Sequence, residues 1–330
     1  MSPRRCILPI FVPHAGCPNN CVFCDQKRIS GSLFPASGEA VREAISALSP
    51  GDGYELAFYG GSFTAIPIPE QEELLSAAGE GLADHRLSSL RVSTRPDAVD
   101  RERLERLRRY GVDTVELGAQ SMDNEVLRRS GRGHTRQDTI EASSLVMAMG
   151  FQLVLQMMTG LPGADAESDL ATAKVLADLK PDGVRIYPTV ILRDTALETL
   201  WRAGVYREHT VEEAVELCSR VLPIFEEKGI PVIRLGLNPS EELSGGAAVG
   251  GAYHPAFGEL VRSRILRDRA ERRMSGLRPG DRAELRVPPE QLSAMIGQHR
   301  CNVDYLMDRF SLASLRIRAG DGGDMELFII

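Results

Sequence analysis

Short apolar runs alternate with longer helical stretches along most of the chain, and this alternation constrains the fold more than any other feature. Seven apolar runs end at glycine, proline or a polar turn, which is typical of strands buried in a sheet. They lie at residues 6–12, 54–59, 90–94, 112–117, 151–158, 183–187 and 232–237, with helical stretches expected at 37–48, 70–82, 101–110, 135–149, 167–179 and 211–228. Strands that alternate with helices form βα units and a parallel sheet. Six or seven such units exceed a minimal doubly wound domain, so we predict an α/β fold close to a parallel barrel.

The residues that follow the predicted strands are chemically unusual. In a parallel barrel, the C-terminal ends of the strands share one face, and that face carries the active site. The first five strands are followed in turn by a cysteine cluster and by residues 59–64, 94–96, 118–121 and 157–160. Glycine and proline alone would only mark turns, but turns do not explain the cysteines. We therefore expect these loops to meet at one functional site.

The sequence offers no membrane-spanning segment and no export signal. No stretch approaches the roughly 18 consecutive apolar residues that a transmembrane helix needs. The short apolar run near the N-terminus is interrupted by Pro9 and Pro13, and no cleavage pattern of small residues follows it. We therefore expect a cytoplasmic protein.

Three of the six cysteines lie within eight residues of one another. Cys17, Cys21 and Cys24 have the spacing C-x3-C-x2-C, whereas Cys6, Cys218 and Cys301 are scattered. Clustered thiols in a reducing compartment indicate a metal site rather than disulfides. Three thiolates can hold three irons of a [4Fe–4S] cluster and leave the fourth iron open. A zinc site completed by His14 is the alternative, although the spacing and the position after the first strand favour the cluster.

This cysteine loop resembles the signature of the radical S-adenosylmethionine (SAM) superfamily. The resemblance implies a partial barrel of six β/α units, a [4Fe–4S] cluster on Cys17, Cys21 and Cys24, and SAM chelated to the fourth iron through its amino and carboxylate groups. It implies that Phe23, the aromatic residue before the last cysteine, packs near the adenine. Gly60, Gly61 and Ser62 resemble the family's glycine motif, whose backbone contacts the SAM amino group; its usual acidic third residue is Ser62 here.

Six further motifs resemble the radical-SAM half of the Elongator catalytic subunit, a tRNA wobble-uridine modifying enzyme. They occur in series at 59–64 (YGGSFT), 93–97 (STRPD), 115–121 (VELGAQS), 132–135 (RGHT), 157–163 (MMTGLPG) and 185–189 (RIYPT), within a similarity over roughly residues 5–260. The resemblance implies that Arg95 and Gln120 line the SAM pocket. A guanidinium fork suits a carboxylate, and an amide can hydrogen-bond a ribose. The alternatives are an ion-pair role for Arg95 and a helix cap for Gln120.

One departure from the Elongator pattern limits what the resemblance implies. That subunit carries a C-terminal acetyltransferase domain, and the present sequence ends too soon for one. An acyl-CoA-dependent carboxymethyl transfer is therefore not expected from the resemblance.

Positive charge is concentrated near the C-terminus. The whole chain has a net charge of −7, but residues 261–330 contain 13 Arg against 10 Asp and Glu, and residues 262–286 contain 9 Arg against 4. A basic surface on an acidic protein indicates an anionic partner. The alternative is a solvated helix laced with ion pairs.

The composition of the sequence changes after Asn238, and we predict three segments. Residues 1–243 form the barrel, residues 244–275 a glycine-rich loop and a basic linker helix, and residues 276–330 a small α+β domain. The last segment shows a strand at 283–287, helices at 290–296 and 301–310 around a turn at 297–300, and a hairpin of 312–318 with 325–330. This order resembles a KH RNA-binding module, which clamps nucleotides through a GXXG loop. Arg300 replaces the second glycine, and an accessory cap without a ligand is the alternative.

Together these features predict a radical SAM enzyme that cleaves SAM to a 5′-deoxyadenosyl radical and modifies RNA, with tRNA as the expected partner. A low-potential electron donor is implied as well. The alternatives are the same chemistry on a peptide or small metabolite, and a non-catalytic protein in which a cluster braces an RNA-binding surface. No catalytic side chain is assigned: Cys218 and Cys301 would qualify as hydrogen donors only if they face the barrel mouth, and a buried inert thiol is the default.

Overall fold

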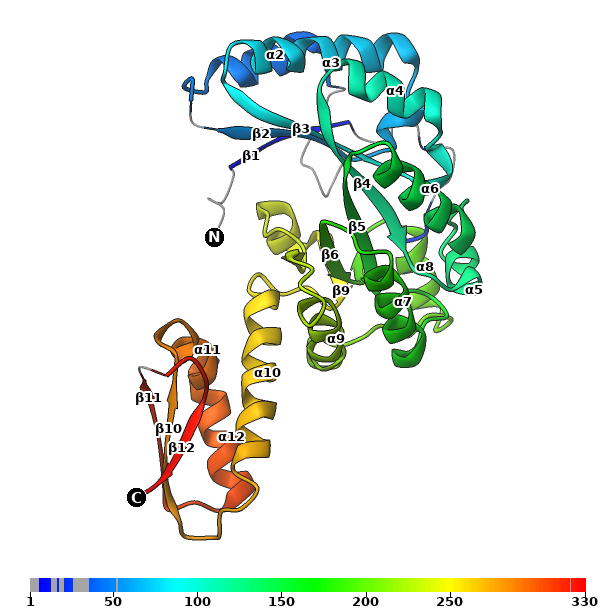
Figure 1. The fold of residues 1–330 in the computed structure, drawn as a ribbon. Helices are drawn as coiled ribbons and strands as arrows, with labels where there is room; N and C mark the ends of the chain where they lie inside the picture. The colour runs from blue at the N-terminus through cyan, green and yellow to red at the C-terminus, as the bar shows by residue number, and fades with distance from the viewer. Residues whose placement is uncertain (1–5, 13–16, 18–20, 26–35, 52, 321) are drawn as a thin grey trace.

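Seven parallel strands form one curved sheet in the order β1-β2-β3-β4-β5-β6-β8 (Figure 1). The structure is a computed structural model that describes residues 6–12, 17, 21–25, 36–51, 53–320 and 322–330. The strands are β1 (Ile7–Phe11), β2 (Tyr54–Tyr59), β3 (Leu87–Thr94), β4 (Val112–Gln120), β5 (Gln152–Thr159), β6 (Gly183–Pro188) and β8 (Val232–Leu235). All neighbouring pairs are parallel, which confirms the predicted α/β partial barrel. Within the described residues β1 and β8 are the edges, so the barrel is open.

Helices cover the convex face of this sheet (Figure 1). They are α2 (Gly38–Ser46), α3 (Ile68–Ala83), α4 (Arg101–Arg109), α6 (Arg136–Ala148), α7 (Ala166–Asp178) and α9 (Val211–Glu226). Two short helices, α5 (Asn124–Arg129) and α8 (Ala196–Arg202), pack in small separate clusters with loop residues. Six of these were predicted, and α5 and α8 were missed because each is too short to show a clear period. Thr135 caps α6 in a reciprocal pair with Asp138. None of the described helices combines the length and the apolar character that crossing a membrane requires.

The main hydrophobic core lies between the sheet and these helices. Side chains alternate between the two faces of a strand. In β2, Leu56 and Phe58 are fully buried in this core, together with Val41 of α2 and Leu75 of α3. The intervening residues therefore point to the concave face, where the polar groups of the site gather.

Two short strands cross the mouth of the sheet. β7 (Val190–Leu192) pairs antiparallel with β9 (Ala248–Gly251). The expected flexible loop is therefore wrong for residues 248–251, which are part of this ribbon. Its glycines allow close packing, because a Cβ on Gly251 would lie 2.7 Å from the Thr189 carbonyl oxygen.

The C-terminal residues form a second, smaller layer of three strands and three helices. It comprises α10 (Phe257–Arg273), β10 (Arg282–Val287), α11 (Leu292–Ile296), α12 (Cys301–Phe310), β11 (Ser314–Ala319) and β12 (Glu326–Ile329). The order of elements after α10 agrees with the expected strand, two helices and two strands. The helices lie on one face of the sheet in Figure 1, and a separate core fills the space between them.

The predicted hairpin of the last two strands is wrong. The strand order is β11-β10-β12, so β10 lies between them, parallel to β11 and antiparallel to β12. The physical reason is burial. Ala283, Leu285 and Val287 of β10 are completely buried. A strand in the centre of a sheet is flanked by a neighbour on each edge, so its apolar side chains are better covered than those of an edge strand. Gly320 makes the crossover possible, because a Cβ there would lie 2.9 Å from Cβ of Arg286.

Helix α10 belongs to both cores. Phe257 and Val261 in its first turns pack into the barrel core, whereas Leu266 and Ala270 pack into the core of the small layer. An ion pair also joins α10 to the barrel, since Arg264 lies 3.8 Å from Glu216 of α9. The helix predicted as a linker is therefore an integral part of two packed units.

Candidate active site

The three clustered cysteines belong to the described part of the loop after β1, which is Cys17 and residues 21–25. Two backbone hydrogen bonds hold residues 21–25 against the end of α5 and the start of α8: Val22 N donates to the Ser130 carbonyl at 3.1 Å, and Leu197 N donates to the Val22 carbonyl at 2.8 Å. A tight turn, with Cys24 N bonded to the Cys21 carbonyl at 3.1 Å, joins two of the thiol-bearing residues. His14, the alternative zinc ligand, lies outside the described residues.

The three thiols lie near enough to affect one another. Burial, and to a lesser extent the neighbouring Cys21 and Cys17, raise the pKa of the Cys24 thiol to about 12. Burial also raises the pKa of Cys17, against the opposing positive charge of Arg95. The Cys17 and Cys24 thiols therefore favour the protonated form until a positively charged group stabilises the thiolate.

The donor set fits a [4Fe–4S] cluster in its chemistry. Three thiols of one loop would serve as thiolate ligands to iron, and two guanidiniums supply positive charge beside them. Arg132 Nη1 lies 3.4 Å from Cys21 Sγ, and Arg95 acts electrostatically on Cys17. Within the described parts of the chain, however, no three Cys, His, Asp or Glu side chains converge closely enough to hold a metal ion.

The glycine motif after β2 has the backbone shape that only glycine adopts easily. Gly60 and Gly61 have φ values of 79° and 54°, so two consecutive residues are left-handed. Ser62 is fully buried, and its hydroxyl lies 2.9 Å from Thr94 Oγ1 and accepts from Arg95 N at 3.3 Å. The Ser62 side chain therefore joins the ends of β2 and β3 and leaves the glycine backbone as the exposed part of this motif.

Arg95, expected in the SAM pocket, is buried beside the cysteine loop. Its guanidinium donates to both carboxylate oxygens of Asp97, through Nε at 2.9 Å and through Nη2. The ion pair that sequence analysis gave as the alternative is thus present. The same guanidinium also lowers the pKa of Cys17, so the pair sits at the edge of the thiol cluster.

Gln120 ends β4 in an unusual conformation. Its φ of 63° is left-handed, and the register between β4 and β5 shifts at this point. Gln156 of β5, which sequence analysis did not assign, donates Nε2 to Gln120 Oε1 at 3.4 Å. Gly118 makes room for the amide, because a Cβ there would lie 2.8 Å from Gln120 Nε2. A strained polar residue at a strand end is typical of functional sites.

Arg132 links the cysteine loop to β4, and no role was assigned to it from sequence. Its Nη2 donates to the Gly118 carbonyl at 2.8 Å while Nη1 faces Cys21, and its buried Nε has no hydrogen-bond partner in the described chain. His134 lies two residues further on. Burial and Arg132 lower the His134 pKa to about 4, so its imidazole is neutral, with Nε2 3.0 Å from the Ala119 carbonyl.

A chain of buried ion pairs crosses the concave face of the sheet. Arg91 Nη2 contacts Glu55 at 3.0 Å, and Arg91 Nη1 lies 3.5 Å from Glu116. Arg185 Nε donates to the same Glu116 at 3.0 Å, and its Nη2 donates to the Tyr59 hydroxyl at 2.5 Å. Each of the four charged groups has an opposite charge beside it, so the floor of the barrel is rigid and polar.

Phe23 packs between two small apolar clusters. One contains Met158 and Leu161, and the other contains Ile191 and Tyr206. The loop after β5 thus lies against the cysteine loop, close to where the resemblance expects the adenine.

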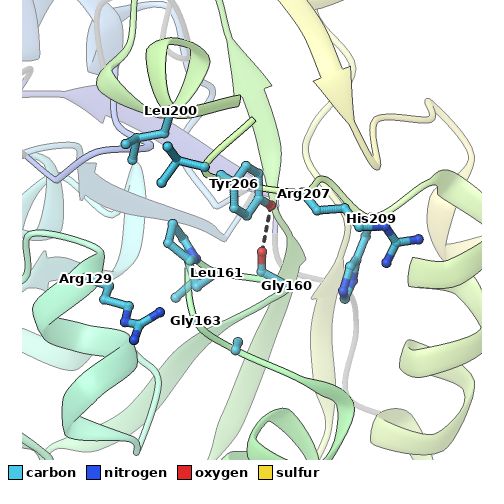
Figure 2. A pocket seen from close by; sticks show the side chains of 11 residues that line it. Arg129, Gly160, Leu161, Gly163, Leu200, Tyr206, Arg207 and His209 are labelled. Carbon is cyan, nitrogen blue, oxygen red and sulfur yellow. Dashed lines mark hydrogen bonds between the residues drawn. The ribbon is translucent and has the colours of Figure 1, made fainter. Parts of the chain in front are cut away.

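A cavity of about 460 Å³ opens beside this loop (Figure 2). Tyr206 points into it and donates its hydroxyl proton to the Gly160 carbonyl at 2.7 Å. Arg129, Arg207 and His209 stand around its rim. The predicted site residues do not line this cavity, so it lies next to the thiol loop rather than within it.

The two other thiols considered as hydrogen donors lie elsewhere. Cys218 is completely buried in α9, and burial raises its pKa to about 12. Cys301 is exposed at the start of α12 in the small layer. Cys218 therefore has the environment of an inert core thiol.

The fold and the cysteine loop together define the class of protein. Residues 11–176 match the Radical SAM superfamily, and residues 181–267 match the Radical_SAM C-terminal domain. The chain belongs to the radical SAM superfamily of enzymes.

More specific similarity is to proteins that act on tRNA uridine and to Elongator. The tRNA uridine(34) acetyltransferase of Methanocaldococcus jannaschii is 31% identical over 232 residues, which are 64% of this chain and 42% of that protein. Elongator complex protein 3 of Homo sapiens is 28% identical over 193 residues, 52% of this chain and 35% of that one. The solved archaeal Methanocaldococcus infernus Elp3 with an N-terminal deletion superposes with a TM-score of 0.64 at 26% identity, covering 80% of this chain and 63% of that chain. The matched part is thus less than half of either curated relative.

Proposed function

We propose that this chain is a radical SAM enzyme that modifies RNA, with tRNA as its substrate class. The observation that carries the proposal is the cysteine loop: three thiols are fixed at the mouth of a parallel sheet, with Arg95 and Arg132 beside their sulfurs. The similarity to tRNA uridine(34) acetyltransferases and Elongator complex protein 3 supports RNA as the substrate.

In this proposal Cys17, Cys21 and Cys24 hold a [4Fe–4S] cluster. When bound, the cluster supplies the electron that breaks the C5′–S bond of SAM. Arg132 places a positive charge beside Cys21 and so stabilises the thiolate form of the loop.

The remaining residues bind and orient the cofactor. The left-handed backbone at Gly60 and Gly61 brings peptide groups within reach of an amino group, and no Cβ obstructs it. Gln120 presents an amide, held by Gln156, to a ribose or carboxylate. Phe23 supplies an apolar wall for the adenine, while Ser62 and Arg95 keep the strand ends in place.

The ion-pair chain on the concave face keeps the substrate side of the site in one geometry. Glu116 is held between Arg91 and Arg185, so none of these side chains is free to rotate toward a reactive group. A radical reaction depends on holding one C–H bond in position and on excluding competing groups.

Three further parts complete the proposal. The RNA substrate reaches the site from the side of the C-terminal layer. A low-potential protein donates the electrons, and the reaction takes place in the cytoplasm.

The test is RNA-dependent cleavage of SAM under anaerobic conditions. Reconstituted protein should contain close to four irons and four sulfides, and dithionite-reduced protein should form 5′-deoxyadenosine faster with total tRNA than without it. Cys24→Ala should lose the iron and the product, whereas Cys6→Ala, at an exposed thiol outside the loop, should retain both. Stoichiometric zinc without sulfide, or stimulation by a peptide pool and not by tRNA, would contradict the proposal.

A further inference from the structure

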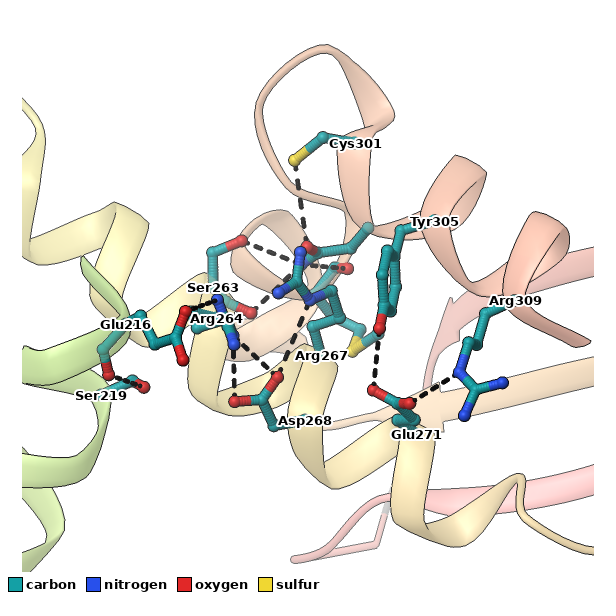
Figure 3. A network of polar contacts seen from close by, with 12 residues as sticks. Glu216, Ser219, Ser263, Arg264, Arg267, Asp268, Glu271, Cys301, Tyr305 and Arg309 are labelled. Carbon is teal, nitrogen blue, oxygen red and sulfur yellow. Dashed lines mark hydrogen bonds and ion pairs between the residues drawn. The ribbon is translucent and has the colours of Figure 1, made fainter. Parts of the chain in front are cut away.

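Most of the arginines that suggested an anionic partner are already neutralised along α10. Arg264 bonds to Asp268 at 2.9 Å, and Arg267 lies over the ring of Tyr305 at 4.2 Å (Figure 3). Glu271 binds Arg309 at 3.0 Å, and Arg273 binds Asp324 at 2.5 Å. The ion-paired helix, given as the alternative in sequence analysis, is therefore what residues 262–273 form.

The three-stranded sheet carries positive charge on its other face. Ala283, Leu285 and Val287 face the helices, so the alternate residues of β10 point away from them. The register places neighbouring side chains of β11 and β12 on the same outward face, which consists of Arg282, Glu284, Arg286, Arg316, Arg318, Glu326 and Phe328. Figure 1 shows no helix over this face. Four arginines against two glutamates leave it positive on a chain whose net charge is −7.

Glu284 organises the middle of this face. It is buried beneath two arginines, accepting from Arg286 Nε at 2.9 Å and lying 3.5 Å from Arg318 Nε. Arg286 in turn lies 4.5 Å from the ring centre of Phe328, which remains 40% exposed. Arg282 and Arg316 are exposed and form no ion pair with any described residue. The face thus combines free guanidiniums with an exposed aromatic ring.

We propose that this arginine face (Arg282, Arg286, Arg316, Arg318 and Phe328) binds a single-stranded segment of the RNA substrate. Surfaces that bind single strands combine positive charge, which follows the phosphates, with aromatic rings on which bases stack. The positive charge of this face on an acidic chain favours an anionic partner, and the exposed Phe328 ring adds a surface on which bases stack, so the two together favour a single-stranded nucleic acid. The inference rests on the proposed function, because it names where the RNA of that reaction is held.

The turn between α11 and α12 is the competing surface. Gly297, His299 and Arg300 all have positive φ values there. Gly297 is also closely packed against the chain itself, because a Cβ at this position would lie 2.7 Å from Cys301 Sγ. The turn offers Arg300 as its guanidinium and lacks the second glycine of a GXXG loop. The sheet offers four arginines and an aromatic ring, so we assign the RNA-binding surface to the sheet.

The experiment measures binding of a fluorescein-labelled 12-nucleotide oligouridylate and of tRNA to the full chain by anisotropy, from 50 to 300 mM salt. Arg316→Glu should weaken both about tenfold and reduce the log–log salt slope by about 0.7, the value for one phosphate contact on a single strand. Phe328→Ala should weaken binding about tenfold with little change in slope, because it removes stacking and not charge. Arg272→Glu is the matched control, because Arg272 is an exposed arginine of α10 that forms no ion pair with any described residue, and it should change affinity less than twofold.

Each outcome decides between the surfaces. Far-UV circular dichroism checks that the variants fold, and Arg316→Gln replaces Arg316→Glu if the latter does not. If Arg300→Glu loses RNA binding and Arg316→Glu does not, the RNA-binding surface is the turn and the inference is overturned. A concentration-dependent dimer that Phe328→Ala abolishes, without any effect on RNA binding, would also overturn it. RNA-stimulated SAM cleavage by the unaltered chain tests the proposed function separately: if it is present while all face variants bind normally, only the arginine face is wrong.

Discussion

Replacing Asp169 with Asn should remove a pH dependence that this carboxyl gives to the stability of the fold. Asp169 lies in α7 and is only 1% exposed. Its Oδ2 accepts a hydrogen bond from Gly160 N at 2.8 Å, whereas Oδ1 is buried and has no hydrogen-bond partner in the described chain. Burial raises the Asp169 pKa from 3.8 to about 7. The folded chain therefore prefers the protonated carboxyl, which Asn resembles in shape and charge.

The magnitude follows from linkage between proton binding and folding. Because the folded pKa lies above the unfolded value, the protonated carboxyl is fully compatible with the fold below pH 4, and stability is lost as pH rises through about 7. A difference of about 3 pH units corresponds to about 4 kcal/mol. Stability of the unaltered chain should therefore fall between about pH 4 and pH 7 and level off above, so Asp169→Asn should be close to neutral below pH 4 and most stabilising above pH 7.

Urea denaturation, followed by the fluorescence of the single tryptophan, measures this difference at several pH values under reducing conditions. Asp165→Asn is the control, since Asp165 is an exposed cap of the same helix and Asn is an equally good cap. The free energy of unfolding of Asp169→Asn relative to the unaltered chain should rise between about pH 4 and pH 7 and stay constant above that range. Parallel pH profiles for the two proteins would show that the carboxyl is not held protonated by the fold.

Two further variants test the packing of the barrel floor and of the small layer. Arg185→Met should cost about 3–5 kcal/mol in urea denaturation, because it leaves buried Glu116 without its 3.0 Å partner; an unchanged midpoint would mean that Arg91 alone neutralises Glu116. Asn302→Ala should cost about 2–4 kcal/mol, since the buried Nδ2 donates to Ser263 Oγ at 2.9 Å and lies 3.1–3.2 Å from three backbone carbonyls. Thermal unfolding by circular dichroism measures the second effect, and a loss below 0.5 kcal/mol would contradict it.

The sequence was informative wherever a signal is local. The strands of the main sheet are short apolar runs bounded by glycine or proline, and each run was found where the structure has a parallel strand. Helix α12 was predicted from its first to its last residue, and in the structure left-handed residues, Arg300 and Ser311, bound it on both sides. The cysteine loop was evident for the same reason, since its three thiols lie within eight residues.

Features that depend on distant partners were not predicted. An apolar pattern shows which face of a strand is buried but not which strand lies beside it, so the insertion of β10 between β11 and β12 was missed. Arg132 is 111 residues away from Cys21 in the sequence, and only the fold shows that its guanidinium faces that sulfur. Counting arginines identified a basic region, but it could not show that most arginines of α10 are ion-paired, whereas Arg282 and Arg316 on the sheet form no ion pair with any described residue.

The dual membership of α10 has a consequence for how such chains can be recombined in evolution. The helix has 17 residues and is therefore about 25 Å long, and its two halves belong to different cores. If recombination joins the barrel to a new C-terminal segment before Phe257, the barrel core loses Phe257 and Val261 unless the new segment replaces them. If the junction falls after Val261, the small layer keeps its core only when the new segment supplies side chains equivalent to Leu266 and Ala270. The barrel and its C-terminal layer are therefore expected to be inherited as one unit, with α10 as the segment that any exchanged partner must supply intact.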